Sequence, residues 1–181
     1  MTTSMDLLDL VYAAVMAAGT AAGNRFYRPG DWPTQPDQYP IGKMRLAKED
    51  RISLGRSGPA EFTTTAHVQI SLAVSEPAKL DDAGAGDAET SLWALKRQVE
   101  VAVINSMPLF SVIQQIPVMR SQLQFAGQAS THLAGIQMDI ALEFYEGPEN
   151  FAPVDAVDLE EVEITMTTFP PTGLSIHLPT S

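Results

Sequence analysis

Alternating apolar and polar positions give the strongest structural signal in this chain. Over the ten residues from Thr65 to Val74, five apolar positions alternate with the polar residues Thr65, His67, Gln69 and Ser71. A period of two is typical of a strand that buries one face and exposes the other. The alternation returns over residues 136–144. The inward positions of the two strands would be Ala66, Val68, Ile70, Leu72 and Val74, and then Ile136, Met138, Ile140, Leu142 and Phe144.

Weaker patterns predict further strands and the loops between them. Ile41–Leu46 has the composition of a strand, residues 118–126 alternate loosely, and Phe26-Tyr27 could begin a short strand. Prolines at positions 29, 33, 36 and 40 exclude a helix or a central strand over that stretch. Trp32 within it is expected to pack back onto the domain rather than to anchor a contact. Residues 47–59 and 77–86 are interpreted as polar loops.

Two segments have helical spacing instead. The first should run from about Met5 to Ala18, with Ser4 as its N-cap and Gly19 as its left-handed end. The second should begin at the cap residue Asp87 and end near Asn105, since Pro108 prevents its continuation. Their buried faces would be Leu8, Val11, Val15 and Ala18 in the first, and Ala88, Leu92, Leu95, Val99 and Ala102 in the second.

The order of these elements predicts an α+β fold: an antiparallel or mixed sheet with both helices packed on one face, plus a C-terminal extension. We assign residues 1–150 to the folded domain and residues 151–181 to the extension. One strand candidate, residues 162–166, lies in the extension. It could add to an edge of its own sheet or to the sheet of a neighbouring copy.

The net charge of −11 is unevenly distributed along the chain. Residues 25–56 hold seven of the basic residues, whereas residues 121–181 hold nine carboxylates and no Lys or Arg. Two interpretations stay open: a monomer whose two ends neutralise each other, or a heterologous contact between copies, basic surface against acidic surface. In the second case one side of the subunit contact would be Arg25, Arg28, Arg45, Lys48, Arg51 and Arg56.

Motifs for chemistry are sparse. The chain has no cysteine, and its three histidines (His67, His132 and His177) lie on separate segments, unlike the clustered ligands of a zinc site. Gly84-Ala85-Gly86 is surrounded by acids, which disfavours phosphate binding. We therefore predict no catalytic, cofactor-binding or metal-binding residues and no enzymatic activity. The acidic charge disfavours sequence-specific nucleic-acid binding, and no apolar run reaches the roughly 20 residues of a membrane span.

The order and spacing of the elements also resemble those of a known family. The phrase Ala22-Gly23-Asn24-Arg25-Phe26-Tyr27 after the first helix, the strand Ile41-Gly42-Lys43-Met44-Arg45-Leu46, and the later strands and helix are similar to tail terminator proteins of long-tailed bacteriophages, the minor tail protein U group. The likeness spans about Met5 to Glu146. Gene transfer agents use similar parts.

This resemblance implies a structural protein of the virion tail or neck, made in the host cytoplasm during assembly. It implies a homo-oligomer, a hexameric ring, that caps the head-proximal end of the tail tube, ends tube polymerisation and joins the tail to the head. The tail tube protein and a head–tail connector protein would be its partners. DNA would pass through the lumen without sequence-specific binding, and an acidic lining would keep phosphates from adhering.

Two other functions remain open at this point. The chain could be another neck component, a head–tail connector or completion protein, or a ligand-binding or enzymatic domain unrelated to tails. The number of copies separates the assembly functions from the last one, and tail length after gene deletion separates a terminator from a connector.

Overall fold

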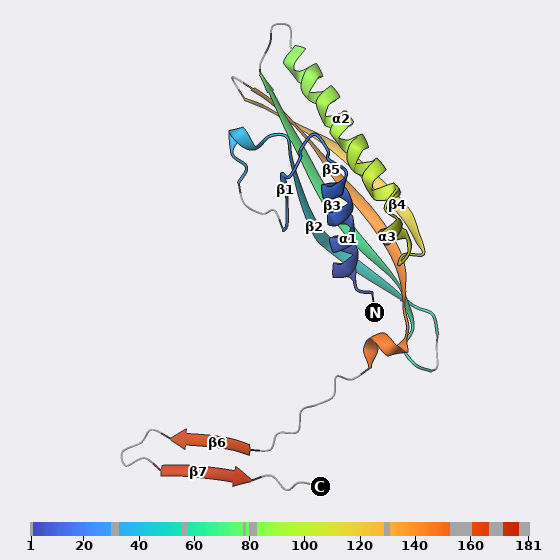
Figure 1. Ribbon diagram of the computed structural model, residues 1–181, viewed down its shortest axis with the longest axis vertical. Coiled ribbons are helices and arrows are strands. Elements are labelled where there is room, and N and C mark those ends of the chain that lie inside the picture. The colour runs from blue at the N-terminus through green and yellow to red at the C-terminus, as the bar shows by residue number, and fades with distance from the viewer. Residues whose placement is uncertain are drawn as a thin grey trace. The chain divides into compact units, whose positions relative to one another are not determined.

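The computed structural model describes residues 2–29, 33–55, 58–77, 79, 83–128, 131–152, 161–166 and 172–177. They belong to two compact units, Met1–Asn150 and Phe151–Ser181. The first unit is a single sheet with its helices on one face (Figure 1). This is the predicted α+β architecture.

Five strands of the first unit form one sheet in the order β1-β2-β3-β5-β4. Their bounds are β1 Phe26–Tyr27, β2 Ile41–Ser53, β3 Phe62–Pro77, β4 Gln115–Gln128 and β5 Thr131–Glu146. Neighbouring strands run antiparallel, except that β1 pairs with β2 in parallel at Phe26–Gly42 and Tyr27–Lys43. The sheet is therefore mixed, one of the two forms that the sequence left open.

The helices are α1 Ser4–Ala17, α2 Ala83–Ile104 and the one-turn α3 Met107–Phe110, with short 3-10 helices at Pro36–Gln38 and Pro148–Phe151. The predicted N-cap Ser4 is wrong. Thr3 caps α1, because its hydroxyl accepts a hydrogen bond from the Asp6 N–H at 3.2 Å while the Asp6 carboxylate accepts one from the Thr3 N–H at 2.8 Å. Gly19 follows α1 with a positive φ of 60°, as its predicted role requires.

Two element boundaries differ clearly from the sequence prediction. Residues 47–53 are strand rather than loop, because β2 keeps its pairing with β3 as far as Ser53–Phe62. Helix α2 begins at Ala83 rather than Asp87. Its Gly84 lies so close to the preceding strand that an added Cβ would be 2.4 Å from the Pro77 carbonyl oxygen. A glycine in the first turn therefore serves close packing of helix against strand.

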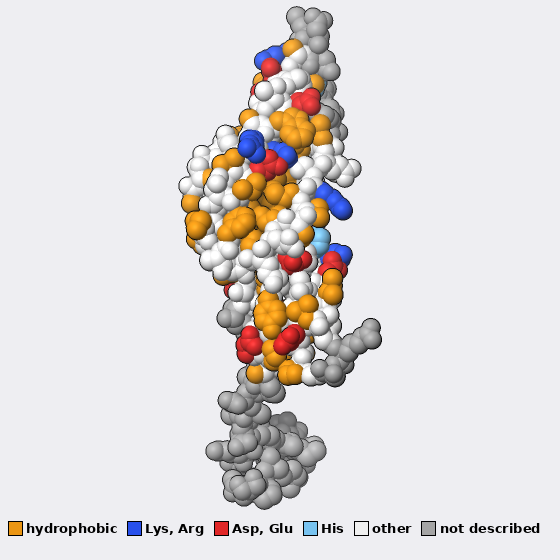
Figure 2. Space-filling view, turned by 90° about the vertical axis from the view of Figure 1, so that its right-hand side faces the viewer, with side chains coloured by type: hydrophobic (Ala, Val, Ile, Leu, Met, Phe, Trp, Pro, Cys, Tyr) orange, Lys and Arg blue, Asp and Glu red, His pale blue; other side chains and the backbone are white. Residues whose placement is uncertain are grey.

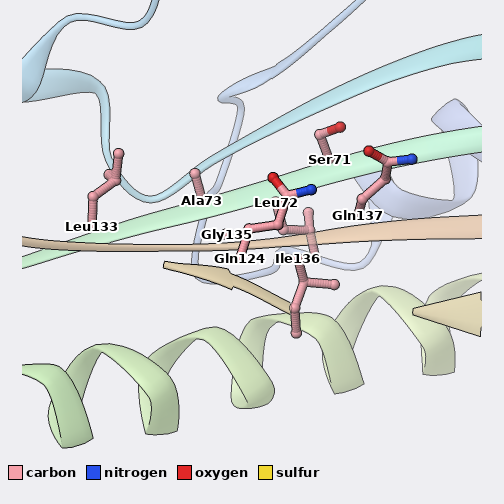
Figure 3. A pocket seen from close by; sticks show the side chains of 8 residues that line it. All are labelled: Ser71, Leu72, Ala73, Gln124, Leu133, Gly135, Ile136 and Gln137. Atoms are coloured by element: carbon pink, nitrogen blue, oxygen red, sulfur yellow. The ribbon is translucent and has the colours of Figure 1, made fainter. Parts of the chain in front are cut away.

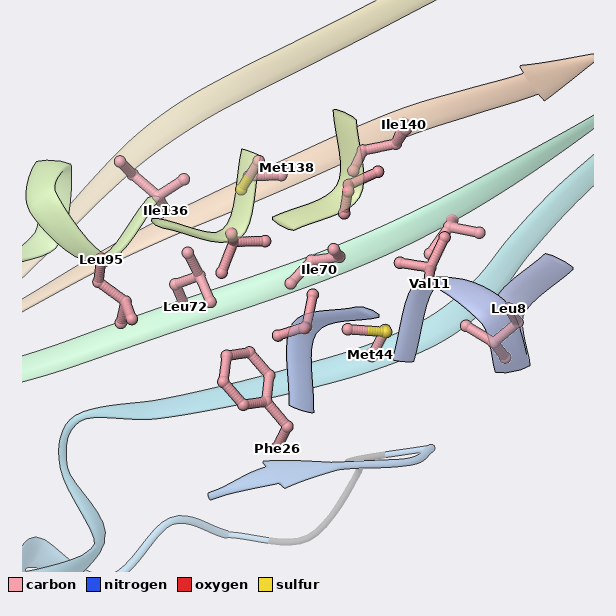
Figure 4. Close-up of a cluster of buried hydrophobic side chains, with 14 of the residues drawn as sticks. Leu8, Val11, Phe26, Met44, Ile70, Leu72, Leu95, Ile136, Met138 and Ile140 are labelled. Carbon is pink, nitrogen blue, oxygen red and sulfur yellow. The ribbon is translucent and has the colours of Figure 1, made fainter. Parts of the chain in front are cut away.

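The core lies between the helices and the sheet face that they cover (Figure 4). All ten inward positions predicted for β3 and β5 are buried, and Leu8 and Val11 of α1 and Leu95 of α2 pack against them. Two predicted core positions are wrong: Ala18 is exposed and Leu7 is buried in the α1 face, and Val103 rather than Ala102 completes the fully buried stripe of α2. Ala18 is the C-cap residue beyond the end of α1, and the α2 stripe continues from Val99 by four residues rather than three.

The second unit contains one antiparallel hairpin. Strand β6, Glu161–Met166, pairs with β7, Thr172–His177, in a register that places Val162 opposite Ile176 and Ile164 opposite Leu174. The predicted strand at 162–166 is confirmed. Its partner β7 is not among the strands that the sequence analysis identified.

Candidate assembly surfaces

The sheet face away from the helices, here called the outer face, carries the polar half of each alternating strand. His67 of β3 lies between two carboxylates, with Nδ1 3.3 Å from Asp139 on β5 and Nε2 3.4 Å from Asp50 on β2. Arg45 of β2 donates from Nε to the Gln69 side-chain oxygen at 2.7 Å. These cross-strand contacts are the polar counterpart of the packed core and help to fix the register.

The outer face carries charges of both signs. The register places basic and acidic side chains there together: Lys43, Arg45, Lys48 and Arg120, with Asp50, Asp139 and Glu143. The strong acidity of the whole chain is therefore not a property of this face.

A β-bulge in β2 divides the six basic residues that the sequence grouped as one contact surface. The register shifts between Leu46 and Lys48, so Arg45 and Lys48 both lie on the outer face, whereas Arg51 lies opposite Thr64 on the helix-covered side. Lys48 forms an ion pair with Asp50 at 2.6 Å. Alternation read straight through residue 47 would have placed Arg51, not Lys48, beside Arg45.

The two earlier arginines flank β1, near α1. Arg25 donates to the carbonyl oxygens of Pro40, at 2.8 Å, and Ala21, at 3.3 Å. Arg28 forms an ion pair with Asp9 of α1, and its guanidinium lies 5.0 Å from the centre of the Tyr12 ring. Arg56 and Trp32 lie outside the described residues. The five described residues of this set thus lie on different parts of the surface, although Arg28 and Arg45 border the same groove.

Arg51 instead belongs to a partly buried ionic cluster at the end of the sheet. Its Nε donates to the Glu146 carboxylate at 2.8 Å, and Thr64 donates to the same carboxylate. Glu146 is only 4% exposed. Burial by itself raises the pKa of the Glu146 carboxyl, but the hydrogen bonds from Arg51 and Thr64 and the Arg51 charge outweigh burial and lower that pKa. This cluster is a structural brace.

A groove, here called the edge groove, lies where β1 ends and β2 continues. It has a volume of about 400 Å³ and is lined by Met5, Leu8, Arg28, Pro29, Met44, Arg45 and Leu46. Within the described part of the chain, β2 has a strand neighbour on this side only at Gly42 and Lys43. The groove therefore combines an apolar wall, two arginines and a sheet edge to which the described residues add no further strand.

A second groove, here called the helix groove, lies between α1 and the junction of α2 with α3. Its volume is about 590 Å³, and most of its lining is apolar: Leu10, Ala13, Ala14, Ala17, Ala18, Ala102, Asn105, Ser106, Met107 and Pro108. Met107 is 78% exposed, and Ile104 and Phe110 beside it are also exposed. Hydrophobic side chains gather in patches over the surface seen in Figure 2. Exposed apolar clusters of this kind mark contact surfaces.

The outer face also has a shallow hollow at Gly135, of about 290 Å³. Figure 3 shows Ser71, Leu133 and Gln137 projecting around it on the side away from α2. The side chains that line this hollow carry no charge and no acid–base group.

The described residues contain no group of three or more His, Asp or Glu side chains placed to hold a metal ion. Nor is any helix in the described part of the chain long and apolar enough to cross a bilayer.

Comparison with known proteins gives little further guidance. No protein-family model and no curated protein matches the chain. Among solved structures, a chain from the virion of a native gene transfer agent particle is similar, with 15% identity, a TM-score of 0.34, and coverage of 74% of this chain and 91% of that one. A TM-score of this size does not establish a common fold.

Proposed function

We propose that this chain is a structural virion protein that assembles into a ring. The ring caps the head-proximal end of a phage-type tail tube, ends tube polymerisation and joins the tail to the head. Assembly rather than catalysis is its role, and about six copies form the ring. The tail tube protein and a head–tail connector protein are its partners.

The observation that carries this proposal is the placement of the two grooves on opposite sides of α1. Met5 and Leu8 line the edge groove, whereas Leu10, Ala13, Ala14 and Ala17 line the helix groove. Because an α-helix turns about 100° per residue, the two sets point roughly 160° apart. A subunit with unlike contact surfaces on opposite sides can bind one neighbour with each, and such heterologous contacts close into rings.

The charges of the outer face limit which surface of the subunit could line a channel for DNA. It carries Lys43, Arg45, Lys48 and Arg120 among its carboxylates. An acidic lumen would therefore have to be lined by another surface of the subunit. DNA could pass without sequence-specific binding whichever surface of the subunit lines the lumen.

Deletion of the gene from the particle that encodes it tests the proposed function. Without a terminator, tube polymerisation continues past its normal end, so negative-stain electron microscopy should show tails of irregular, excessive length. Supplying the full chain from a plasmid should restore uniform tails. Tails of normal length that fail to attach to heads would contradict a terminator and favour a head–tail connector.

A further inference from the structure

We propose that the C-terminal hairpin of one copy docks on the next copy, where β6 adds as an extra strand to β2 at the edge groove. This inference rests on the proposed function, since it assumes that copies assemble. It names the segment that joins them and the surface that receives it.

The edge of β2 that would receive the strand is paired with β1 over two residues within the described part of the chain. β1 pairs with β2 at Gly42 and Lys43 and then ends, while β2 continues from Met44 to Ser53. An incoming strand would follow the line of β1 and pair with the part of β2 beyond Lys43, for which the described residues supply no strand neighbour. Peptide segments are recognised at sheet edges in this way, with main-chain hydrogen bonds for affinity and alternate side chains for specificity.

The two sides of β2 differ at this place. Met44 and Leu46 face the helix-covered side, where Met5 and Leu8 of α1 continue the apolar wall of the groove. Arg45 lies on the outer face, and the bulge keeps Lys48 on that face as well. A complementary strand must therefore be apolar on one side and acidic on the other.

The sequence of β6 has this alternation. Val162, Ile164 and Met166 alternate with Glu161, Glu163 and Thr165. Since alternate residues of a strand lie on opposite faces, pairing with β2 would set the apolar residues toward Met44 and Leu46 and the two glutamates toward Arg45 and Lys48. Residues 151–181 hold five carboxylates and no Lys or Arg, so the whole segment is attracted to a basic edge.

The hairpin also needs a partner for its own stability. A two-stranded hairpin is at best marginally stable alone in water. The β6–β7 register sets Val162 opposite Ile176 and Ile164 opposite Leu174, so the apolar positions of both strands share one face. Docking on the edge groove would bury that face against the apolar wall beside α1.

The other sheet edge lacks these features. On the outer face, the described side chains of β4 include one basic residue, Arg120, between Val118 and Gln122. Pro117 lies within the register irregularity between Gln115 and Val118 and has no N–H to donate to a new strand. Both edges have a register shift, in β2 between Leu46 and Lys48, so the charge, the apolar groove and the proline of β4 are what favour β2 as the receiving edge.

Disulfide trapping tests the inference cleanly because the chain contains no cysteine. Arg45→Cys is combined in turn with Glu161→Cys, Glu163→Cys and Thr165→Cys, which together sample one face of β6. Each double variant is oxidised mildly as the full chain and run on a non-reducing denaturing gel. Two cysteines cross-link only when their Cα atoms come within about 7 Å.

If β6 docks on a neighbour, at least one double variant gives a ladder of dimers, trimers and larger species up to the closed ring. The matched control, Arg120→Cys with the same β6 partners, gives none. A fast-migrating monomer would mean that β6 binds its own copy, and a ladder only with Arg120→Cys would mean the other edge. Either result, or no cross-link at all, overturns the inference.

Two further outcomes distinguish a failure of this inference from a failure of the proposed function. A ring by native mass spectrometry without a ladder would leave the function standing and remove the hairpin as the joining segment. A ladder up to a closed ring, with tails of normal length after gene deletion, would leave the hairpin contact standing and remove the terminator role.

Discussion

The two edges of the sheet belong to one structure but differ in almost every respect that matters for assembly. The β2 edge is basic, borders an apolar groove beside α1, and is paired with β1 over only two residues. The β4 edge carries glutamines and a proline next to a register irregularity. Exposed edges invite pairing with other chains, and bulges and prolines are common means of preventing it. Both edge strands contain a register irregularity, so the proline of β4 and the basic charge and apolar groove of β2 are what distinguish the two edges.

The largest expected effect concerns the pairing of β1 with β2. A Cβ added at Gly42 would lie 2.2 Å from two ring carbons of Phe26, which is buried in the core. Gly42→Ala should therefore displace β1 and lower the free energy of unfolding by about 3 kcal/mol, the upper range for overpacking. Chemical denaturation measures this loss.

Gly135→Ala is the matched control in the same sheet. The nearest atom to an added Cβ there is the Leu72 carbonyl oxygen at 3.4 Å, an ordinary contact. We expect a change within about 0.5 kcal/mol, typical of substitutions that disturb no packing. Equal losses in the two variants would show that β1 does not depend on its close approach to Gly42.

The second effect concerns the ionic brace at the far end of β2. Arg51→Met would leave the buried Glu146 carboxylate without its cation. Loss of one partner from a buried pair costs 3–5 kcal/mol, but the Arg51 side chain is 43% exposed, so we expect about 2 kcal/mol. Thermal unfolding of Arg51→Met and Arg120→Met measures the difference between the edges. A similar small loss of stability in both variants would contradict a stabilising role for the contact between Arg51 and Glu146.

The pH dependence of stability gives a smaller effect with a definite sign. The folded pKa of Glu146 lies below its unfolded value, so its contribution is complete above the unfolded value, roughly pH 4.3. This stabilising contribution is lost as the pH falls through the folded pKa of Glu146, which lies below the unfolded pKa. Stability curves of the wild type and Glu146→Gln should be well separated at pH 7 and should converge in acid. Parallel curves down to pH 3 would refute the assignment.

The smallest effect concerns the charges that orient the contact. Exposed ion pairs contribute about 0–1 kcal/mol each, so reversing Arg45 and Lys48 to Glu should weaken self-association roughly tenfold. The loss should be greatest at low salt, since salt screens exposed charges. Arg120→Glu should leave association unchanged. Sedimentation at two salt concentrations separates these cases, and equal weakening at both edges would remove the distinction between them.

The fold follows from the sequence wherever periodicity is strong. The alternation in 65–74 and 136–144 locates both central strands and their buried faces, because a half-buried sheet requires that pattern. Boundaries depend on contacts that no local pattern contains. Residues 47–53 are mostly polar but are extended because β3 pairs with them. The helix start at Ala83 depends on Gly84 fitting against Pro77.

The candidate surfaces are less accessible to sequence reasoning. Charge counting identifies a basic region, but the bulge at residue 47 sends Arg51 to the opposite side of the sheet from Arg45. Both grooves depend on where α1 lies across the sheet and beside α2, which no local pattern specifies. The short run of small residues Ala13, Ala14 and Ala17 was the available signal for the helix groove, since small side chains leave room for a close neighbour.

Native mass spectrometry of the full chain tests the central claim most directly, because it counts the copies without assuming how they touch. We predict a closed species of about six copies at micromolar concentration, and the loss of that species when residues 151–181 are removed. A stable monomer of 19.6 kDa across that concentration range would contradict it.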